Sequence, residues 1–312
     1  MSLEKKKSKY ILSLNGGGIR GIIILYFLKY LEKDLLEKTG KTIYETFDMF
    51  GGTSVGSLIT GTIVYHKFTI DEILNIYTDD VFKSIFTKNT SLYSKILYGP
   101  IYNGQYKTDV LDRNFGKTIM SSAEKPVLFT VYSVDEQRPR FYKSYSVNEQ
   151  KQDPCLVSEI INASSSPPGY FGSIKYTDSE GVHYGVDGAV FANNPCDCIY
   201  ADALQLFKGD DIKVLSLGTG NKNITSLHQE TTKWGPLQWL LKGSIFDIIM
   251  ESSPEDVNYR MKQFTEAFGH TYMYIDHKTS ISIDDVTKIT ELKEMGYKWY
   301  METKDKLFED FF

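Results

Sequence analysis

The sequence predicts an α/β fold, a three-layer α/β/α sandwich with a mostly parallel central sheet. Short apolar runs typical of buried strands alternate with longer runs in which apolar residues recur at helical spacing. At 10–14 and again at 46–50, such a strand run passes through glycines directly into a helical run. This order of strand, tight turn and helix is typical of parallel sheets, because their strands are joined by helical crossovers.

Each expected element follows from its local pattern. The first strand is 10–14, and the helix after Gly21 runs to Lys38 before Gly40 ends it. The second strand, 46–50, leads into a helix from Val55 to about Tyr65. Further strands are expected at 127–134, 140–146 and 212–217, and further helices at 154–163, 196–207, 237–250, 255–268 and from 286 onward.

The composition is that of one globular domain. With 312 residues, of which 41% are hydrophobic and 24% charged, the chain can bury a large core. We expect a single catalytic domain over 1–312, with its core at about 10–220 and a mostly helical C-terminal elaboration at 221–312. The net charge of −5 argues against a nucleic-acid partner, because phosphate binding needs a concentrated basic face. The sequence alone does not define an oligomeric state.

The cysteines and the apolar runs indicate the compartment. Cys155, Cys196 and Cys198 are odd in number, and two of them are only two residues apart, so a disulfide framework is not expected. No histidine pairs with another histidine or a cysteine at a spacing typical of metal ligands, so no metal is expected. The first apolar run is too short for a signal peptide, and the longest, 22–28, is far below the roughly 20 residues of a membrane span. We expect a cytoplasmic protein with at most peripheral membrane contact.

Gly52-Thr53-Ser54-Val55-Gly56 has the pattern of a nucleophile elbow. A serine hydroxyl must project from rigid backbone toward a base, and a sharp turn from strand to helix achieves this. The turn brings backbone atoms close together, so residues without side chains are needed at Gly52 and Gly56. The helix that follows Ser54 points its positive end at developing negative charge.

A glycine-rich loop, Gly16-Gly17-Gly18-Ile19-Arg20-Gly21, precedes the first helix. Its unshielded N–H groups can bind an anion, either a phosphate or the oxyanion of a tetrahedral intermediate. A dinucleotide fold expects an acidic residue at the end of the next strand, whereas the acidic residues here lie within the continuing helix. The oxyanion interpretation, using Gly17 and Gly18 N–H groups, is therefore favoured. Arg20 either braces the loop and adds charge, or is a surface arginine.

Asp187 is the favoured base. His228, His270 and His277 occur late in the chain, but none sits in a glycine-rich strand-end setting. Asp187 does, because it follows an apolar run and precedes Gly188 and Ala189. An aspartate with its free pKa of about 3.9 is a weak base, so this role requires burial that raises the pKa.

Together these motifs resemble the patatin-like phospholipase family, whose members carry a glycine-rich loop, Gly-x-Ser-x-Gly and Asp-Gly-Ala/Gly in this order. Segments 163–171, 193–195 and 215–220 also resemble the family, and the resemblance covers about 10–220. Asn15 departs from it, because many members carry aspartate there.

The resemblance implies a Ser-Asp dyad, with Ser54 as nucleophile and Asp187 as general base. It implies an oxyanion hole from the backbone of Gly16, Gly17 and Gly18 with Arg20. It further implies a lipid acyl hydrolase acting on phospholipids or galactolipids without metal or cofactor. The residues that support the motifs are Gly21, Gly52, Gly56, Gly188 and Ala189.

Two apolar segments could meet the lipid. In 77–106, aromatic residues alternate with lysines; core packing is favoured, and the alternative is a cap over an acyl groove. In 234–250, apolar residues at helical spacing are more typical of a buried helix than of a membrane-facing one, and Trp239 is the residue to test. The alternative functions are a non-catalytic or effector-regulated lipid-binding module and a nucleotide-binding protein.

Overall fold

The computed structural model describes residues 6–90, 99–146, 155–222, 234–235, 238 and 244–312. A central sheet of eight strands has the order β5-β6-β3-β2-β1-β7-β9, with β4 paired to β3. Neighbouring strands from β3 to β9 along this order are parallel, whereas β4, β6 and β5 add antiparallel pairs at one side. The predicted mostly parallel sheet is therefore confirmed. The strands are β1 (Ser8–Leu14), β2 (Met49–Gly52), β3 (Val127–Ser133), β4 (Arg138–Lys143), β5 (Ile174–Asp178), β6 (Gly181–Asp187), β7 (Asp211–Leu217) and β9 (Thr271–Ile275).

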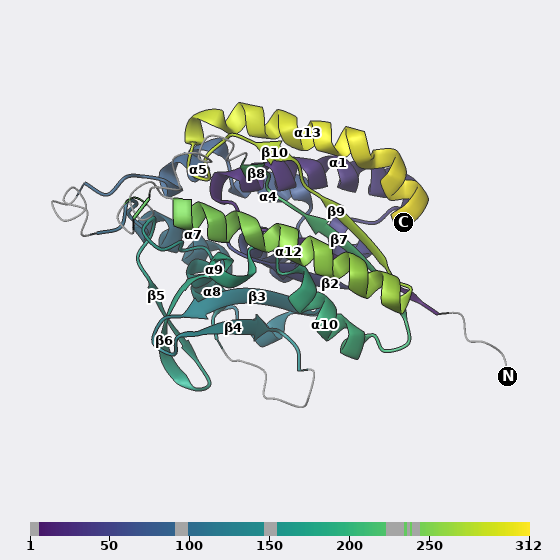
Figure 1. Ribbon diagram of the computed structural model, residues 1–312, viewed down its shortest axis with the longest axis horizontal. Coiled ribbons are helices and arrows are strands. Elements are labelled where there is room, and N and C mark those ends of the chain that lie inside the picture. The colour runs from purple at the N-terminus through teal and green to yellow at the C-terminus, as the bar shows by residue number, and fades with distance from the viewer. Residues whose placement is uncertain (1–5, 91–98, 147–154, 223–233, 236–237, 239–243) are drawn as a thin grey trace.

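Helices cover both faces of the sheet, which makes the three layers (Figure 1). The main ones are α1 (Gly21–Thr39), α3 (Val55–His66), α4 (Ile70–Ile76), α5 (Asp79–Ile85), α7 (Gln105–Phe115), α8 (Val157–Ser164), α10 (Cys196–Leu206), α12 (Ser244–Phe268) and α13 (Ile289–Lys306). Two four-residue helices, α2 (Ile43–Thr46) and α9 (Ala189–Ala192), precede β2 and follow β6. Figure 1 shows α13 lying along α1.

The two faces follow from the alternation of side chains along each strand. On β1, Leu12 packs into the larger core with α1, α3 and α13, and its neighbour Ile11 packs into a second core with α10 and α12. On β7, Leu215 likewise packs into the larger core and Val214 into the second one. Strands buried on both faces read as continuous apolar runs, which is why 10–14 and 212–217 were recognisable in the sequence.

Some boundaries differ from the prediction. The strand expected at 46–50 is β2, Met49–Gly52, because residues 43–46 form α2 instead. Thr42 caps that helix, accepting a hydrogen bond from the N–H of Glu45, while the Glu45 carboxylate accepts one from the N–H of Thr42. The sequence analysis missed the β5–β6 hairpin and β9. Beyond 220 the described chain is mostly helical, but β9 also extends the central sheet.

The prediction of separate helices at 237–250 and 255–268 was wrong for the described part, because α12 continues through Pro254. Proline has no N–H to donate to the carbonyl of Met250, four residues earlier, and this loss normally ends or kinks a helix. Here the side-chain amide of Asn193 donates to that carbonyl at 2.8 Å. A partner from outside the helix thus supplies the missing donor.

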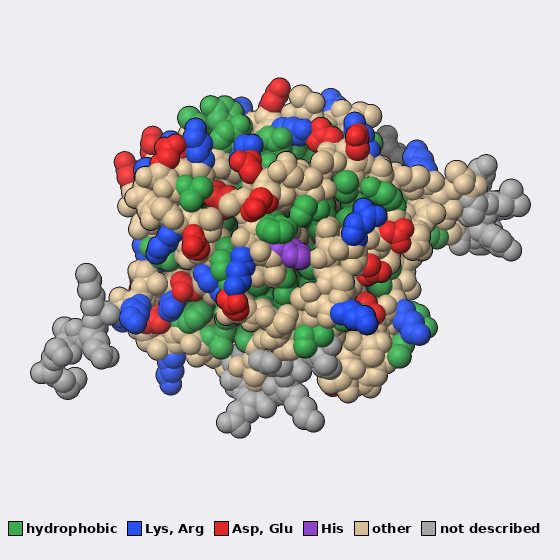
Figure 2. Space-filling model, turned by 180° about the vertical axis from the view of Figure 1, so that it is seen from behind, with side chains coloured by type: hydrophobic (Ala, Val, Ile, Leu, Met, Phe, Trp, Pro, Cys, Tyr) green, Lys and Arg blue, Asp and Glu red, His purple; other side chains and the backbone are tan. Residues whose placement is uncertain are grey.

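Two features of the structure concern membranes and nucleic acids. In the described ranges, every helix is too short or too polar to cross a membrane. Figure 2 shows the face opposite to that of Figure 1, where the basic and acidic side chains of the described residues are interspersed. This face therefore lacks, among its described residues, the concentrated positive charge that nucleic acids require.

Candidate active site

Ser54 occupies the sharp turn between β2 and α3. Its backbone has φ 57° and ψ −125°, a conformation that L-residues rarely adopt, and its side chain is buried. A Cβ added to Gly52 would collide with the backbone of Gly56, and one added to Gly56 would collide with the carbonyl of Leu14. Two backbone segments therefore touch here, as the elbow interpretation requires, and the strained turn presents the serine at a fixed position.

Asp187 ends β6 and is fully buried. Its Oδ1 accepts a hydrogen bond from the N–H of Ala189 at 2.9 Å, whereas Oδ2 has no partner of standard geometry among the described residues. Burial raises the pKa of Asp187 to about 7, and the Ala189 N–H, the nearby Ser54 hydroxyl and the charge of Lys107 oppose this rise. The structure thus brings Ser54 and Asp187 together and leaves a buried oxygen that can accept a proton.

One short segment, here called the serine turn (Ser164, Ser165 and Ser166), holds both groups. The Ser164 hydroxyl accepts a hydrogen bond from the N–H of Ser54 at 3.1 Å. The carbonyl of Ser166 accepts one from the N–H of Asp187 at 3.0 Å. Ser54 and Asp187 are therefore both held by residues of the same short turn.

The glycine loop lies beside Ser54. In this described loop, the N–H of Gly16 donates to Asn193, that of Ile19 to Ile283 and that of Arg20 to Gly17, which leaves the N–H groups of Gly17 and Gly18 as possible donors to a ligand. Gly18 has φ +56°, and a Cβ there would overlap the Ile283 carbonyl. The Gly16 N–H, predicted as part of the oxyanion hole, is already used inside the protein.

The loop is held in place by hydrogen bonds that involve residues the sequence analysis did not predict. The Thr219 hydroxyl donates to the Gly16 carbonyl at 2.7 Å. Asn15 donates to the Tyr274 hydroxyl at 3.3 Å, which in turn donates to Asp276 at 2.7 Å. Burial raises the pKa of Asp276 to about 6, and the charge of Arg20 is among the influences that lower it. Arg20 is also buried, so it is not a surface arginine.

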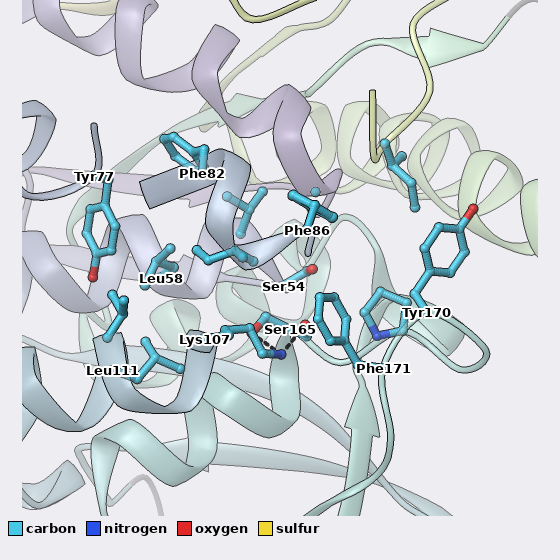
Figure 3. A pocket seen from close by; sticks show the side chains of 16 residues that line it. Ser54, Leu58, Tyr77, Phe82, Phe86, Lys107, Leu111, Ser165, Tyr170 and Phe171 are labelled. Atoms are coloured by element: carbon cyan, nitrogen blue, oxygen red, sulfur yellow. Dashed lines mark hydrogen bonds between the residues drawn. The ribbon is translucent and has the colours of Figure 1, made fainter. Parts of the chain in front are cut away.

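Ser54 lines a mostly apolar cavity of about 630 Å³, the open mouth included. Figure 3 shows Ser54 between two groups of side chains, with Leu58, Tyr77 and Leu111 toward one end and Tyr170 and Phe171 toward the other. Polar groups in the lining are Ser54, Ser165 and Lys107, and the last was not predicted. The apolar lining consists of Val55, Leu58, Tyr77, Phe82, Ile85, Phe86, Val110, Leu111, Pro167, Tyr170, Phe171 and Ile283, with Gly18 beside them.

The two apolar segments differ in outcome. In the described part of 77–106, Tyr77, Phe82, Ile85 and Tyr102 are buried. Tyr77, Phe82 and Phe86 also form part of the cavity wall. In 234–250, Met250 is buried but Ile248 and Ile249 are about 40% exposed, contrary to the expectation of burial. Trp239 and residues 91–98 lie outside the described residues.

The described histidines lie away from the cavity lining. Of those that the structure describes, none lines it. His183 lies between two carboxylates, with Nδ1 3.0 Å from Asp135 and Nε2 3.1 Å from Asp178. Glu136, Glu180 and His183 could approach one cation, but Arg140 already pairs with both glutamates. That cluster is therefore a structural ion network.

Comparison with known proteins decides the family. The family model described as patatin-like phospholipase matches residues 12–198, more than half of the chain. This protein is a patatin-like phospholipase family member. Patatin-like protein 1 of Arabidopsis thaliana is 30% identical over 92% of this chain and 80% of its own length. Patatin-2-Kuras 4 of Solanum tuberosum is 30% identical over 74% of this chain and 68% of its own.

Solved structures overlap only in part. VipD from Legionella pneumophila has a TM-score of 0.43 and 12% identity, covering 96% of this chain and 67% of that one. Human GIVD cytosolic phospholipase A2 in complex with methyl gamma-linolenyl fluorophosphonate has a TM-score of 0.40 and 13% identity, covering 76% of this chain and 43% of that one. The family assignment itself confirms the patatin fold and supports lipid acyl hydrolysis in general terms.

Proposed function

We propose that this patatin-like protein is a phospholipase A-type lipid acyl hydrolase that works through a Ser-Asp dyad. One observation carries the proposal: a serine on a strained turn lines a mostly apolar cavity and lies beside a fully buried carboxylate, one oxygen of which has no hydrogen-bond partner of standard geometry. Strain and a shifted pKa both cost stability, and they persist where function requires them.

In the first half-reaction, the Ser54 Oγ attacks the carbonyl carbon of an acyl ester and Asp187 accepts the hydroxyl proton. The tetrahedral intermediate then collapses, the C–O bond to the alcohol breaks, and Asp187 returns the proton to the departing lysolipid. In the second half, Asp187 takes a proton from a water molecule as the water oxygen attacks the carbonyl carbon of the acyl-serine. The tetrahedral intermediate collapses, the C–O bond to Ser54 breaks, Asp187 returns the proton to the Ser54 Oγ, and the fatty acid leaves. A carboxylate with a pKa near 7 suits both directions of transfer at neutral pH.

The glycine loop and the cavity supply the rest. The N–H groups of Gly17 and Gly18, which have no backbone acceptor in the described loop, would stabilise the oxyanion, each contributing about 10²–10³ in rate by analogy with known oxyanion holes. The apolar walls around Leu58, Tyr77 and Leu111 suit a fatty acyl chain. Ester lipids reside in membranes, so we place the reaction at a lipid surface that a cytoplasmic protein contacts peripherally.

The test is product analysis on defined mixed-chain phospholipids by mass spectrometry, comparing the unaltered protein with Ser54→Ala. The unaltered protein should release fatty acid and lysolipid, and Ser54→Ala should release neither while unfolding at the same urea concentration. Ser252→Ala, on the exposed side of α12, is the matched control and should retain full turnover. Lipid binding without turnover in the unaltered protein would instead indicate a non-catalytic lipid-binding module.

A further inference from the structure

Lys107 is the buried cation of the cavity. It lies on α7, is 5% exposed, and is covered by the ring of Phe171, whose centroid is 4.4 Å from the ammonium nitrogen. Long charged side chains are rarely buried without a carboxylate partner, because removing the charge from water is costly. Among the described residues, no carboxylate oxygen lies within 4.0 Å of this nitrogen.

The ammonium group instead holds the serine turn. It donates to the carbonyl of Ser165 at 2.6 Å, to the hydroxyl of Ser166 at 2.7 Å and to the carbonyl of Asn162 at 3.2 Å (Figure 3 draws its bonds to Ser165). These carbonyls lie at the C-terminal end of α8, where backbone acceptors are unpaired and a positive charge is favoured.

The same turn makes the contacts that hold the dyad. Ser164 accepts from the backbone of Ser54, and Ser166 accepts from the backbone of Asp187. Lys107 donates to Ser165, which lies between these two contacts, and to Ser166, which makes one of them. Moving the ammonium would therefore move the nucleophile and the carboxylate relative to each other.

The charge of Lys107 also faces Asp187. Burial lowers the pKa of Lys107 to about 7 and Asp187 raises it, just as Lys107 lowers the pKa of Asp187. Among the described residues, Asp187 is the charged group that affects the pKa of Lys107. The other groups facing Lys107 from α3, α5 and α8 are hydroxyls, carbonyls and apolar side chains. Each of these two charges therefore favours the ionised form of the other.

We infer that Lys107 is a positioning residue of the reaction: its ammonium fixes the serine turn that holds Ser54 and Asp187, and its positive charge favours the ionised, proton-accepting form of Asp187. The inference rests on the proposed function, because it assigns Lys107 a role toward that dyad. A purely structural lysine at a helix end would stabilise α8 without affecting when Asp187 ionises.

The experiment measures the second-order rate constant for phosphonylation of the intact protein by a small dialkyl fluorophosphonate across pH 5–10. For the unaltered chain we expect a bell: the rate rises as Asp187 ionises and falls as Lys107 loses its proton. Lys107→Met removes the charge, and its acidic midpoint should move up by about 1 pH unit or more. Lys107→Arg keeps the charge at all these pH values, so its alkaline decline should disappear while the acidic limb remains.

Lys117→Met, an exposed lysine just after α7, is the matched control and should keep the unaltered profile. A folded Lys107→Met variant with an unchanged acidic midpoint would overturn the inference. A Lys107→Arg variant that keeps the alkaline decline would also overturn the inference. This second variant decides the question if Lys107→Met fails to fold. Absence of labelling at Ser54 in the unaltered chain would overturn the proposed function itself, and this result is distinct from either variant outcome.

Discussion

Replacing Asp187 with asparagine should make the protein more stable and nearly inactive at the same time. Asparagine has the same shape and keeps an oxygen for the 2.9 Å hydrogen bond from Ala189. Its NH₂ group can donate to the Ser54 hydroxyl oxygen, so this hydroxyl keeps a partner. What the substitution removes is a negative charge from a fully buried position and the acceptor for the serine proton.

The size of the effect follows from the pKa. Burial raises the pKa of Asp187 from an ordinary 3.8 to about 7, so folding favours the protonated form. The unaltered protein therefore loses stability as pH rises from about 4 to about 7, and the loss is complete above that range. At pH 8, the free energy of unfolding of Asp187→Asn should therefore exceed that of the unaltered protein by at most about 4 kcal/mol. Part of this gain is offset, because Lys107 loses the carboxylate that favours its charged form.

Urea unfolding of Asp187→Asn and the unaltered protein at pH 8 and at pH 5 measures this. We expect a large gain in the free energy of unfolding at pH 8 and a smaller one at pH 5, with turnover reduced by about 10²–10⁴. Asp112→Asn, on the exposed side of α7, should change neither quantity. Equal stability at both pH values, or turnover within tenfold of the unaltered protein, would refute the reasoning.

Three other predictions concern the loop, the helix and the cavity. Gly18→Ala should cut turnover by about 100-fold, because the added side chain displaces the donor amides. Gly40 also has a positive φ but has open space around it, so Gly40→Ala should lose only about 1 kcal/mol of stability and no activity. Equal activities of the two variants would contradict this. Asn193→Ala should lower the free energy of unfolding by about 1–3 kcal/mol, since a buried carbonyl in α12 loses its donor. Adding Pro254→Ala should recover part of that loss in urea unfolding, and no recovery would show that the carbonyl is not the cause. Tyr77→Ala should enlarge the end of the cavity near Leu58 and Leu111 and shift the preference in competitive hydrolysis toward longer acyl chains. An unchanged preference would place the acyl chain elsewhere.

The parts of the site that sequence analysis located are those built from local constraints. At Ser54 the tight turn leaves no room for side chains at its flanking glycines, so composition alone marks it. The same holds for Gly18, where positive φ and a neighbouring carbonyl exclude other residues. Asp187 could be proposed because it follows an apolar strand run at a sheet end.

The parts that were missed depend on contacts between distant segments. Lys107 is one lysine on an amphipathic helix, and its partners come more than 50 residues later. Asp276 follows β9, whose apolar run and polar end are a strand signal that was overlooked. Pro254 looked like a helix boundary because its compensating donor, Asn193, lies in another part of the chain.

Peptide mass spectrometry after reaction with a fluorophosphonate tests the dyad most directly, because it identifies the modified residue without requiring the natural lipid. The unaltered protein should carry the phosphonyl group on Ser54, and Asp187→Asn should carry it at a rate lower by at least about 100-fold. Modification of a different serine, or equally fast labelling of Ser54 when Asp187 has become an amide, would show that these two residues do not act together.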